Sequence, residues 1–243
     1  MRFMIFLLFY SLFSFPGFSQ DPWEEILLVN IDTNYYWSSS ELNKPDDFIM
    51  GKYDAINLFD RNKATAWVEG EKDAGIGQYV MIGVGVAVPA KIFFNNGFQK
   101  SKDLYFKNNR LKSAQISLYA GINLPGHETQ LGPQYQAIKY GKDLSVLFVD
   151  SMKTQAFDLA WNPIEVVNFK KEVLDRFKKE YPDKVHATGD WFSIQYILKI
   201  TITGVYKGSK WDDTCISDIW VETPKISVKT GLLPNTLDRF LWD

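Results

Sequence analysis

Short runs rich in β-branched and aromatic residues recur along most of this 243-residue chain, at a spacing of roughly ten residues. Turn-forming Gly, Pro, Asn and Asp residues separate them. The clearest predicted strands are 78–88, 91–94, 110–119, 144–149, 156–161, 191–206 and 214–222. From Ala114 onward, the run 110–119 alternates apolar and polar residues, which indicates a strand with one buried face. This pattern predicts an all-β sandwich or jelly roll.

One segment departs from the β pattern. Residues 166–181 place Val, Phe and Leu side chains three and four positions apart, with charged residues between them. This spacing predicts an amphipathic helix that ends at Pro182. We therefore expect an all-β jelly-roll β-sandwich with a helical insertion at about residues 162–182. Residues 104–109 and 121–141 are expected to be loops.

The N-terminus reads as a targeting segment. Arg2 precedes an apolar run from Phe3 to Phe15, which is shorter than the ~20 residues that a membrane span needs. Small residues at 17 and 19 suit a cleavage site before Gln20. We expect a signal peptide at 1–19 and export to the periplasm, the cell surface or the medium, with no membrane span in the mature chain. The alternative is an N-terminal membrane anchor.

The remaining chain divides into three expected parts. These are an N-terminal lead-in at 20–52, the β-sandwich domain at 53–223 and a C-terminal tail at 224–243. In the tail we expect a strand at 226–229 and docked aromatic residues at Phe240 and Trp242.

Composition excludes several classes of protein. A hydrophobic content of 46% is enough for a core, and a net charge of −2 argues against a nucleic-acid partner. Cys215 is the only cysteine, so no intrachain disulfide can form, and we expect it in the core. The chain has two histidines, no His-Glu-x-x-His helix and no Gly-x-Ser-x-Gly elbow. We therefore expect no enzyme; the alternative is a glycosidase acting through Glu69 and Asp213.

The stretch 58–77, LFDRNKATAWVEGEKDAGIG, contains a candidate calcium site. Asp60, Asn62 and Thr65 offer side-chain oxygens at positions i, i+2 and i+5 of one loop, and Asp218 could complete the shell. The alternative is that Asp60 and Asn62 only shape an Asx-type turn, because positive residues flank both of them. Trp67, between Ala66 and Val68, is expected in the core.

Several motifs together resemble a known family. Phe59-Asp60 followed by Thr65-Ala66-Trp67 resembles the FDG(D/N)xxTAW turn of discoidin-like (F5/8 type C) galactose-binding-fold domains. Further similar segments follow in order at 66–70, 75–78, 96–101, 105–112, 205–208 and 213–219. They look like the domain found beside bacterial NAD glycohydrolase toxins, where it acts in translocation and glycan binding. The similarity covers roughly residues 53–222.

The resemblance implies a jelly roll and a non-catalytic, glycan-binding role. The acidic turn and the final acidic position of the family correspond to Asp60 and Asp218. Arg61 stands where the family usually has glycine, which makes the turn less free.

We expect a carbohydrate-binding module, secreted or associated with the envelope, that takes a glycan or glycoconjugate. Sugar recognition needs multidentate polar groups and a stacking face. The candidate ligand residues are Glu69, Asn96, Lys100, Tyr105, Asn109, Arg110, Trp211 and Asp213. For Arg110 a structural role on loop carbonyls or carboxylates remains open. The alternative function is a structural or protein-interaction adaptor of the bacterial cell envelope, working through residues 162–190 and the tail.

Overall fold

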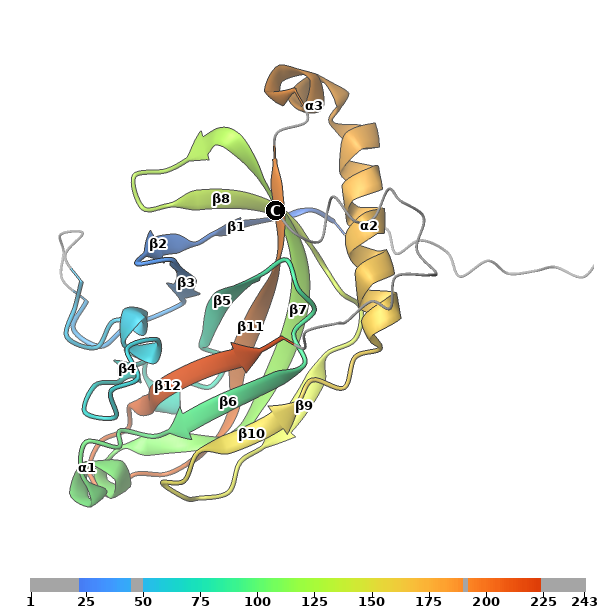
Figure 1. Ribbon diagram of the computed structural model, residues 1–243. Helices are drawn as coiled ribbons and strands as arrows, with labels where there is room; N and C mark the ends of the chain where they lie inside the picture. Colours follow the sequence, from blue (N-terminus) through green and yellow to red (C-terminus); the bar gives the residue numbers. More distant parts are fainter. Residues whose placement is uncertain (1–21, 45–49, 190–191, 224–243) are drawn as a thin grey trace, which may run out of the picture.

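A computed structural model describes residues 22–44, 50–189 and 192–223 (Figure 1). The predicted signal peptide and the predicted C-terminal tail, including the strand at 226–229, Phe240 and Trp242, lie outside the described residues. The strands are β1 (Glu24–Leu27), β2 (Val29–Ile31), β3 (Asn34–Ser38), β4 (Trp67–Val68), β5 (Tyr79–Gly85), β6 (Lys91–Asn96), β7 (Asn109–Glu128), β8 (Pro133–Lys139), β9 (Leu144–Leu147), β10 (Gln155–Asp158), β11 (Ser193–Tyr206) and β12 (Thr214–Glu222). The helices are α1 (Lys102–Lys107), α2 (Pro163–Glu180) and α3 (Pro182–Thr188), with short 3₁₀ turns at Ala55–Leu58 and Asp73–Gly75.

The strands form a β-sandwich of the jelly-roll type, as predicted. One layer contains β10, β6 and β12, and the other contains β7, β11, β5, β3 and β2 (Figure 1). At one corner β12 runs parallel to the start of β7, with Thr214 opposite Asn109 and Cys215 opposite Arg110. This parallel pairing joins the two layers at the end of the sandwich that carries α1.

Strand alternation builds the core between the layers. Ile116 and Leu118 of β7 and Ile200 of β11 are buried together with Phe94 of β6 and Ile219 of β12. The expectation for two further residues is confirmed. Trp67 is fully buried and its Nε1 donates to the Ser40 carbonyl at 3.0 Å, and Cys215 is fully buried as well.

The prediction of a loop at 121–141 is wrong. β7 continues to Glu128 and returns as β8, with Tyr119 opposite Lys139. The Gly and Pro residues that suggested a loop occupy the end of this long hairpin, where the register shifts between Asn123 and Glu128. Pairing along the flanking strands outweighs these local signals.

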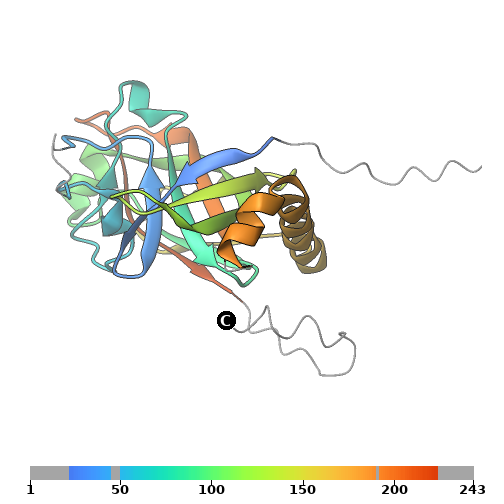
Figure 2. The ribbon, with the colours of Figure 1, turned by 90° about the horizontal axis from the view of Figure 1, so that it is seen from above.

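The helical insertion covers the part of β7 that extends beyond the sandwich. Val173 and Phe177 of α2 pack with Ala120 and Ile122 of β7. Figure 2 shows α2 and α3 together on one side of the strands. The amphipathic helix α2 ends at Glu180, just before Pro182, as predicted. Pro182 then begins the separate helix α3, since proline is tolerated at the first position of a helix. None of the described helices is both long and apolar enough to cross a membrane.

One further segment differs from expectation. Residues 104–109 were expected to be a loop, but α1 covers most of them. Its N-cap is Ser101, whose Oγ accepts a hydrogen bond from the Leu104 amide at 3.1 Å. Within the 20–52 segment, β3 pairs with β5 and β1 pairs with β8. That segment therefore belongs to the same sheet as the rest of the domain.

Candidate functional site

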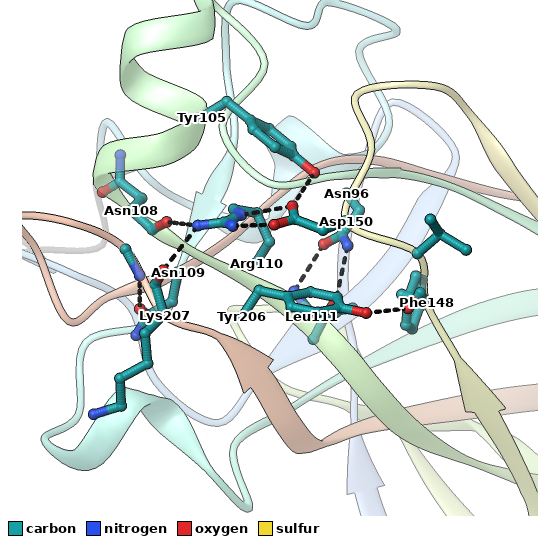
Figure 3. A network of polar contacts seen from close by, with 12 residues as sticks. Asn96, Tyr105, Asn108, Asn109, Arg110, Leu111, Phe148, Asp150, Tyr206 and Lys207 are labelled. Carbon is teal, nitrogen blue, oxygen red and sulfur yellow. Dashed lines mark hydrogen bonds and ion pairs between the residues drawn. The ribbon is translucent and has the colours of Figure 1, made fainter.

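Arg110 lies at the centre of a polar network at the end of the sandwich (Figure 3). Its side chain is 4% exposed, and Nε and Nη2 donate to the two carboxylate oxygens of Asp150 at 3.2 and 2.5 Å. Nη1 donates to the carbonyls of Asn108 and Lys207 at 3.0 and 3.1 Å. The guanidinium thus ties β7 to the chain after β9 and to the chain after β11.

Tyr105 and Gly97 enclose this arginine. The Tyr105 hydroxyl donates to Asp150 Oδ1 at 2.9 Å, and its ring centroid is 5.1 Å from Arg110 Cζ. Burial, followed by the hydrogen bond to Asp150, raises the pKa of Tyr105. Gly97 has a φ of 79°, and a Cβ there would lie 2.5 Å from Arg110 Cγ. The packing leaves no room for a ligand between these side chains.

Two fully buried asparagines brace the neighbouring loops. The side-chain Nδ2 of Asn96 donates to the backbone carbonyl of Leu111, and its Oδ1 accepts from the backbone amide of Leu111, both at 2.8 Å. Asn109 donates to the Asp212 carbonyl at 2.7 Å and accepts from the Gly208 amide at 2.6 Å. Asn96, Tyr105, Asn109 and Arg110 thus lie together, and they point into the protein. We call these four residues and Asp150 the loop brace.

Glu69 is also sealed inside. Its two carboxylate oxygens accept hydrogen bonds from the amides of Thr214 and Glu71, at 3.0 and 2.8 Å. Burial is the main cause of its raised pKa. Asp213 is partly exposed, and burial and the charge of Asp212 raise its pKa. Because Glu69 has no exposed surface, Glu69 and Asp213 do not flank a cleft that a glycosidic bond could enter.

Trp211 and Lys100 are the exposed members of the predicted set. Trp211 is 36% exposed, and the Lys210 Nζ lies 4.7 Å from the centroid of its ring. Lys100 lines a hollow of about 190 Å³ beside α1, which we call the loop-end pocket. The residues lining it are Lys52, Tyr53, Ala64, Thr65, Ala66, Phe98, Lys100 and Leu104.

The loop-end pocket combines aromatic surface with positive charge. The rings of Tyr53 and Phe98 meet edge to face with centroids 6.5 Å apart, and the Lys52 Nζ lies 5.0 Å from the Tyr53 ring. Lys52 and Lys100 both line the pocket, and its lining includes no carboxylate. Lys52, Tyr53 and Phe98 are not among the candidate ligand residues that the sequence indicated. Phe98 lies inside the 96–101 motif and could have been found, but the other two reach the pocket only through the fold.

The loop from Asp60 to Thr65 forms an Asx-type turn. Asp60 Oδ1 accepts from the Asn62 amide at 2.8 Å, and Oδ2 accepts from the Thr65 hydroxyl at 2.6 Å. Asn62 Oδ1 accepts from the Ala64 amide at 3.0 Å. The oxygens proposed as calcium ligands therefore hold the turn together.

Asp218 has a buried carboxylate oxygen without a hydrogen-bond partner. It is fully buried; Oδ2 accepts from Asn95 Nδ2 at 2.7 Å, and Oδ1 has no hydrogen-bond partner. Burial raises its pKa and the charge of Asp60 adds to the rise, whereas Arg61 and Lys63 lower it. An unpartnered buried carboxylate oxygen near Asp60 fits a hard cation, although the two positive residues oppose one. Among the described residues, no three or more His, Cys, Asp or Glu side chains gather where they could hold a metal.

One protein-family model matches most of the chain. The family model for the NAD glycohydrolase translocation F5/8 type C domain matches residues 31–222. No curated protein matches the chain.

Several solved structures are similar to this chain at low identity. An F5/8 type C domain from Bacteroides fragilis has 14% identity and a TM-score of 0.42, over 82% of this chain and 95% of that one. The family 32 carbohydrate-binding module of C. perfringens NanJ, solved with galactose, has 12% identity and a TM-score of 0.38, over 82% and 98%. The mycobacterial arabinofuranosyltransferase AftD has 14% identity and a TM-score of 0.41, and the match covers 83% of this chain but 11% of that enzyme. The family match over residues 31–222 shows that this chain belongs to the NAD glycohydrolase translocation F5/8 type C domain family.

Proposed function

We propose that this chain is an exported, non-catalytic carbohydrate-binding module that takes its glycan in the loop-end pocket. The observation that carries the proposal is the pairing of two aromatic rings with two lysines in a hollow of about 190 Å³. Drug-sized ligands occupy roughly 300–1,000 Å³, so this hollow suits a single sugar unit at the end of a glycan.

The lining residues indicate the type of sugar. Tyr53 and Phe98 provide an apolar surface for the C–H face of a sugar ring. Lys52 and Lys100 donate hydrogen bonds and positive charge, with no lining carboxylate to neutralise them. This combination favours a glycan that carries an acidic group.

The sealed carboxylates support a non-catalytic role. Hydrolysis of a glycosidic bond needs two carboxyl groups on either side of the substrate. Glu69 and Asp218 are both fully buried, and the lining of the loop-end pocket contains no acid. Hydrolysis of a glycan bound in the pocket would contradict this part of the proposal.

A glycan array with neutral and acidic glycans, in the presence of calcium and of a chelator, tests the binding. We expect acidic glycans among the ligands, and Lys100→Ala and Phe98→Ala should weaken their binding about tenfold, which corresponds to about 1.4 kcal/mol. Lys171→Ala, at an exposed position on α2, is the matched control and should bind as the wild type does. A folded protein that binds no glycan would refute the proposal.

We also propose that Ca²⁺ binds at Asp60, Asn62, Thr65 and Asp218. The unpartnered Oδ1 of Asp218 supports the proposal, because calcium would supply the charge partner that this buried oxygen lacks. Calorimetric titration with CaCl₂ should show one site in the wild type and none in Asp218→Asn. An equal thermal midpoint with calcium and with chelator, together with no binding heat, would favour the simple Asx turn.

Export and the adaptor alternative are tested separately. Mass spectrometry of the protein from its native host should find a mature N-terminus at Gln20, and an intact Met1 would contradict the signal peptide.

An envelope adaptor that works through the helical insertion stays a prediction. The apolar face of α2 packs against β7 and β8, so that a partner would have to contact the charged face of α2.

A further inference from the structure

A second groove lies on the outer face of the sheet, on the opposite side from the core. Strand alternation sends Trp37 of β3, Met81 of β5 and Lys199 of β11 to this face, where Trp37 pairs with Met81 and Met81 with Lys199. Tyr79 shares this face because it lies two residues before Met81. Their neighbours in sequence, such as Val80 and Ile200, point the other way into the core.

The first strand supplies the opposite wall. β8 pairs with β7 and β1 pairs with β8 (Figure 1), and Ile26 of β1 packs with Met81 of β5 on this face. Glu24 and Glu25 of β1 line the same groove as Trp37, Tyr79, Met81 and Lys199. Its volume is about 300 Å³, larger than the loop-end pocket.

Buried, closely packed side chains form the floor of the groove. Met81 is 6% exposed and packs with Ile26, Tyr119 and Ile197 in a buried cluster of its own. Trp37 and Tyr79 pack against this cluster and remain partly exposed. Their rings are therefore fixed by their own strands and still reach solvent, which is what a stacking surface requires.

Charged groups stand on both sides of these rings. The Lys199 Nζ lies 4.0 Å from the Tyr79 ring centroid. In the part of the chain that the structure describes, Lys199 forms no ion pair, although Glu24 and Glu25 line the same groove. Glu24 lies on the same side of β1 as Ile26 and faces the groove, whereas the Glu25 side chain points to the other side of the strand, where Gln136 donates to its Oε1 at 2.9 Å. A ligand would thus meet the Lys199 ammonium on one wall and the Glu24 carboxylate on the other.

This arrangement selects among ligand classes. A sugar hydroxyl both donates and accepts hydrogen bonds, so a chain of hexoses satisfies the Lys199 ammonium and the Glu24 carboxylate together. An acidic polymer would be repelled by Glu24 and Glu25. An extended peptide pairing with the free edge of β1 would find four residues, two of them glutamates, and charged residues on a short edge strand hinder such pairing.

We propose that this groove, lined by Trp37, Tyr79, Lys199, Glu24 and Glu25, is a second saccharide-binding site, for a neutral hexose oligosaccharide. It shares no lining residue with the loop-end pocket, so it does not rest on the proposed function. The molecule would then hold an acidic glycan at the loop end and a neutral chain on the sheet face.

Affinity electrophoresis of the full chain tests the proposal. Native gels containing a soluble galactan, glucan or mannan are compared with gels containing alginate as the acidic polymer. We expect retardation by at least one neutral polysaccharide that does not change between about 50 and about 500 mM salt, because an uncharged ligand is not screened. An affinity that falls steeply with salt, or binding to alginate alone at this groove, would overturn the proposal.

Four variants assign the binding to the groove. Trp37→Ala and Lys199→Met should weaken neutral-polysaccharide binding about tenfold. Lys199→Met keeps an aliphatic side chain packed on the Tyr79 ring and should therefore fold normally. It tests the groove even if Trp37→Ala is too unstable to be measured. Lys171→Met is the control for charge removal and Lys100→Ala the control for the other site, and both should retain this binding.

The two proposals fail in different ways. No neutral polysaccharide binding in the wild type, or binding that survives in Lys199→Met and Trp37→Ala, overturns the groove proposal. Loss of neutral binding in Lys100→Ala alone would place that ligand in the loop-end pocket instead. Failure of acidic glycans to bind leaves the groove proposal standing and refutes only the acidic pocket.

Discussion

Replacing Arg110 by methionine separates a structural arginine from a ligand-binding one. The substitution keeps most of the buried stem and removes the guanidinium, which donates four hydrogen bonds. Two of these go to Asp150, and the others go to the carbonyls of Asn108 and Lys207. If the loop brace is structural, the cost appears as lost stability rather than as lost affinity.

The magnitude follows from what the substitution leaves behind. Breaking a buried ion pair costs roughly 3–5 kcal/mol, and each buried carbonyl that loses its donor adds about 1–3 kcal/mol. The Asp150 side chain is 33% exposed, so water compensates part of the loss. We therefore expect Arg110→Met to lower the free energy of unfolding by about 4 kcal/mol. At about 2–4 °C per kcal/mol for a domain of this size, Tm should fall by roughly 10 °C.

Urea denaturation followed by tryptophan fluorescence measures the free energy, and glycan binding is measured on the same samples below the transition. Asp150→Asn should cost less, since the amide oxygen still accepts from the arginine. Lys171→Met should stay within about 0.5 kcal/mol of the wild type. A variant with unchanged Tm that has lost glycan binding would show that Arg110 contacts the ligand and that the brace interpretation is wrong.

Three further predictions concern Glu41, Lys170 and Gly97. Burial raises the pKa of the Glu41 carboxyl to about 7 from an ordinary 4.5. The protonated carboxyl therefore contributes its full share to the free energy of unfolding below pH 4.5, and this share is lost as the pH rises through 7. Glu41→Gln should flatten this pH dependence in urea melts and stabilise the protein at pH 8 by up to about 3 kcal/mol, and an unchanged slope would contradict the assignment. Burial lowers the pKa of Lys170 to about 8 from 10.5. Between these two pH values the unfolded chain binds more protons than the folded one, so the free energy of unfolding should rise between pH 8 and 10. Lys170→Met should remove this rise in a pH series of thermal melts. Gly97→Ala should cost at least about 2 kcal/mol in urea melts because its φ is positive and its Cβ would strike Arg110, whereas Gly141→Ala, with open space, should be nearly neutral; equal effects would refute the packing argument.

Elements whose signals are local could be predicted from the sequence. The strand 214–222 has the bounds of β12, and the helix prediction differs from α2 by a few residues. Both predictions depend on a spacing of apolar residues that repeats within one segment and needs no information from distant parts of the chain. The length of β7 could not be predicted this way, because the glycines and prolines near its end are compatible with a loop and with a hairpin.

The sequence by itself determined the β-rich pattern, the single amphipathic helix, the family motifs and the burial of Trp67. Only the tertiary structure decided which polar residues are buried and which reach the surface. Asn96, Tyr105, Asn109 and Arg110 have the chemistry of sugar-binding residues, and each is buried with hydrogen-bond partners 2 to 103 positions away. A polar side chain that is satisfied inside a protein and one that waits for a ligand look alike in sequence, because the difference lies in partners that only the folded chain brings together. The same reason explains why the loop-end pocket and the outer groove appear only when strands distant in sequence meet.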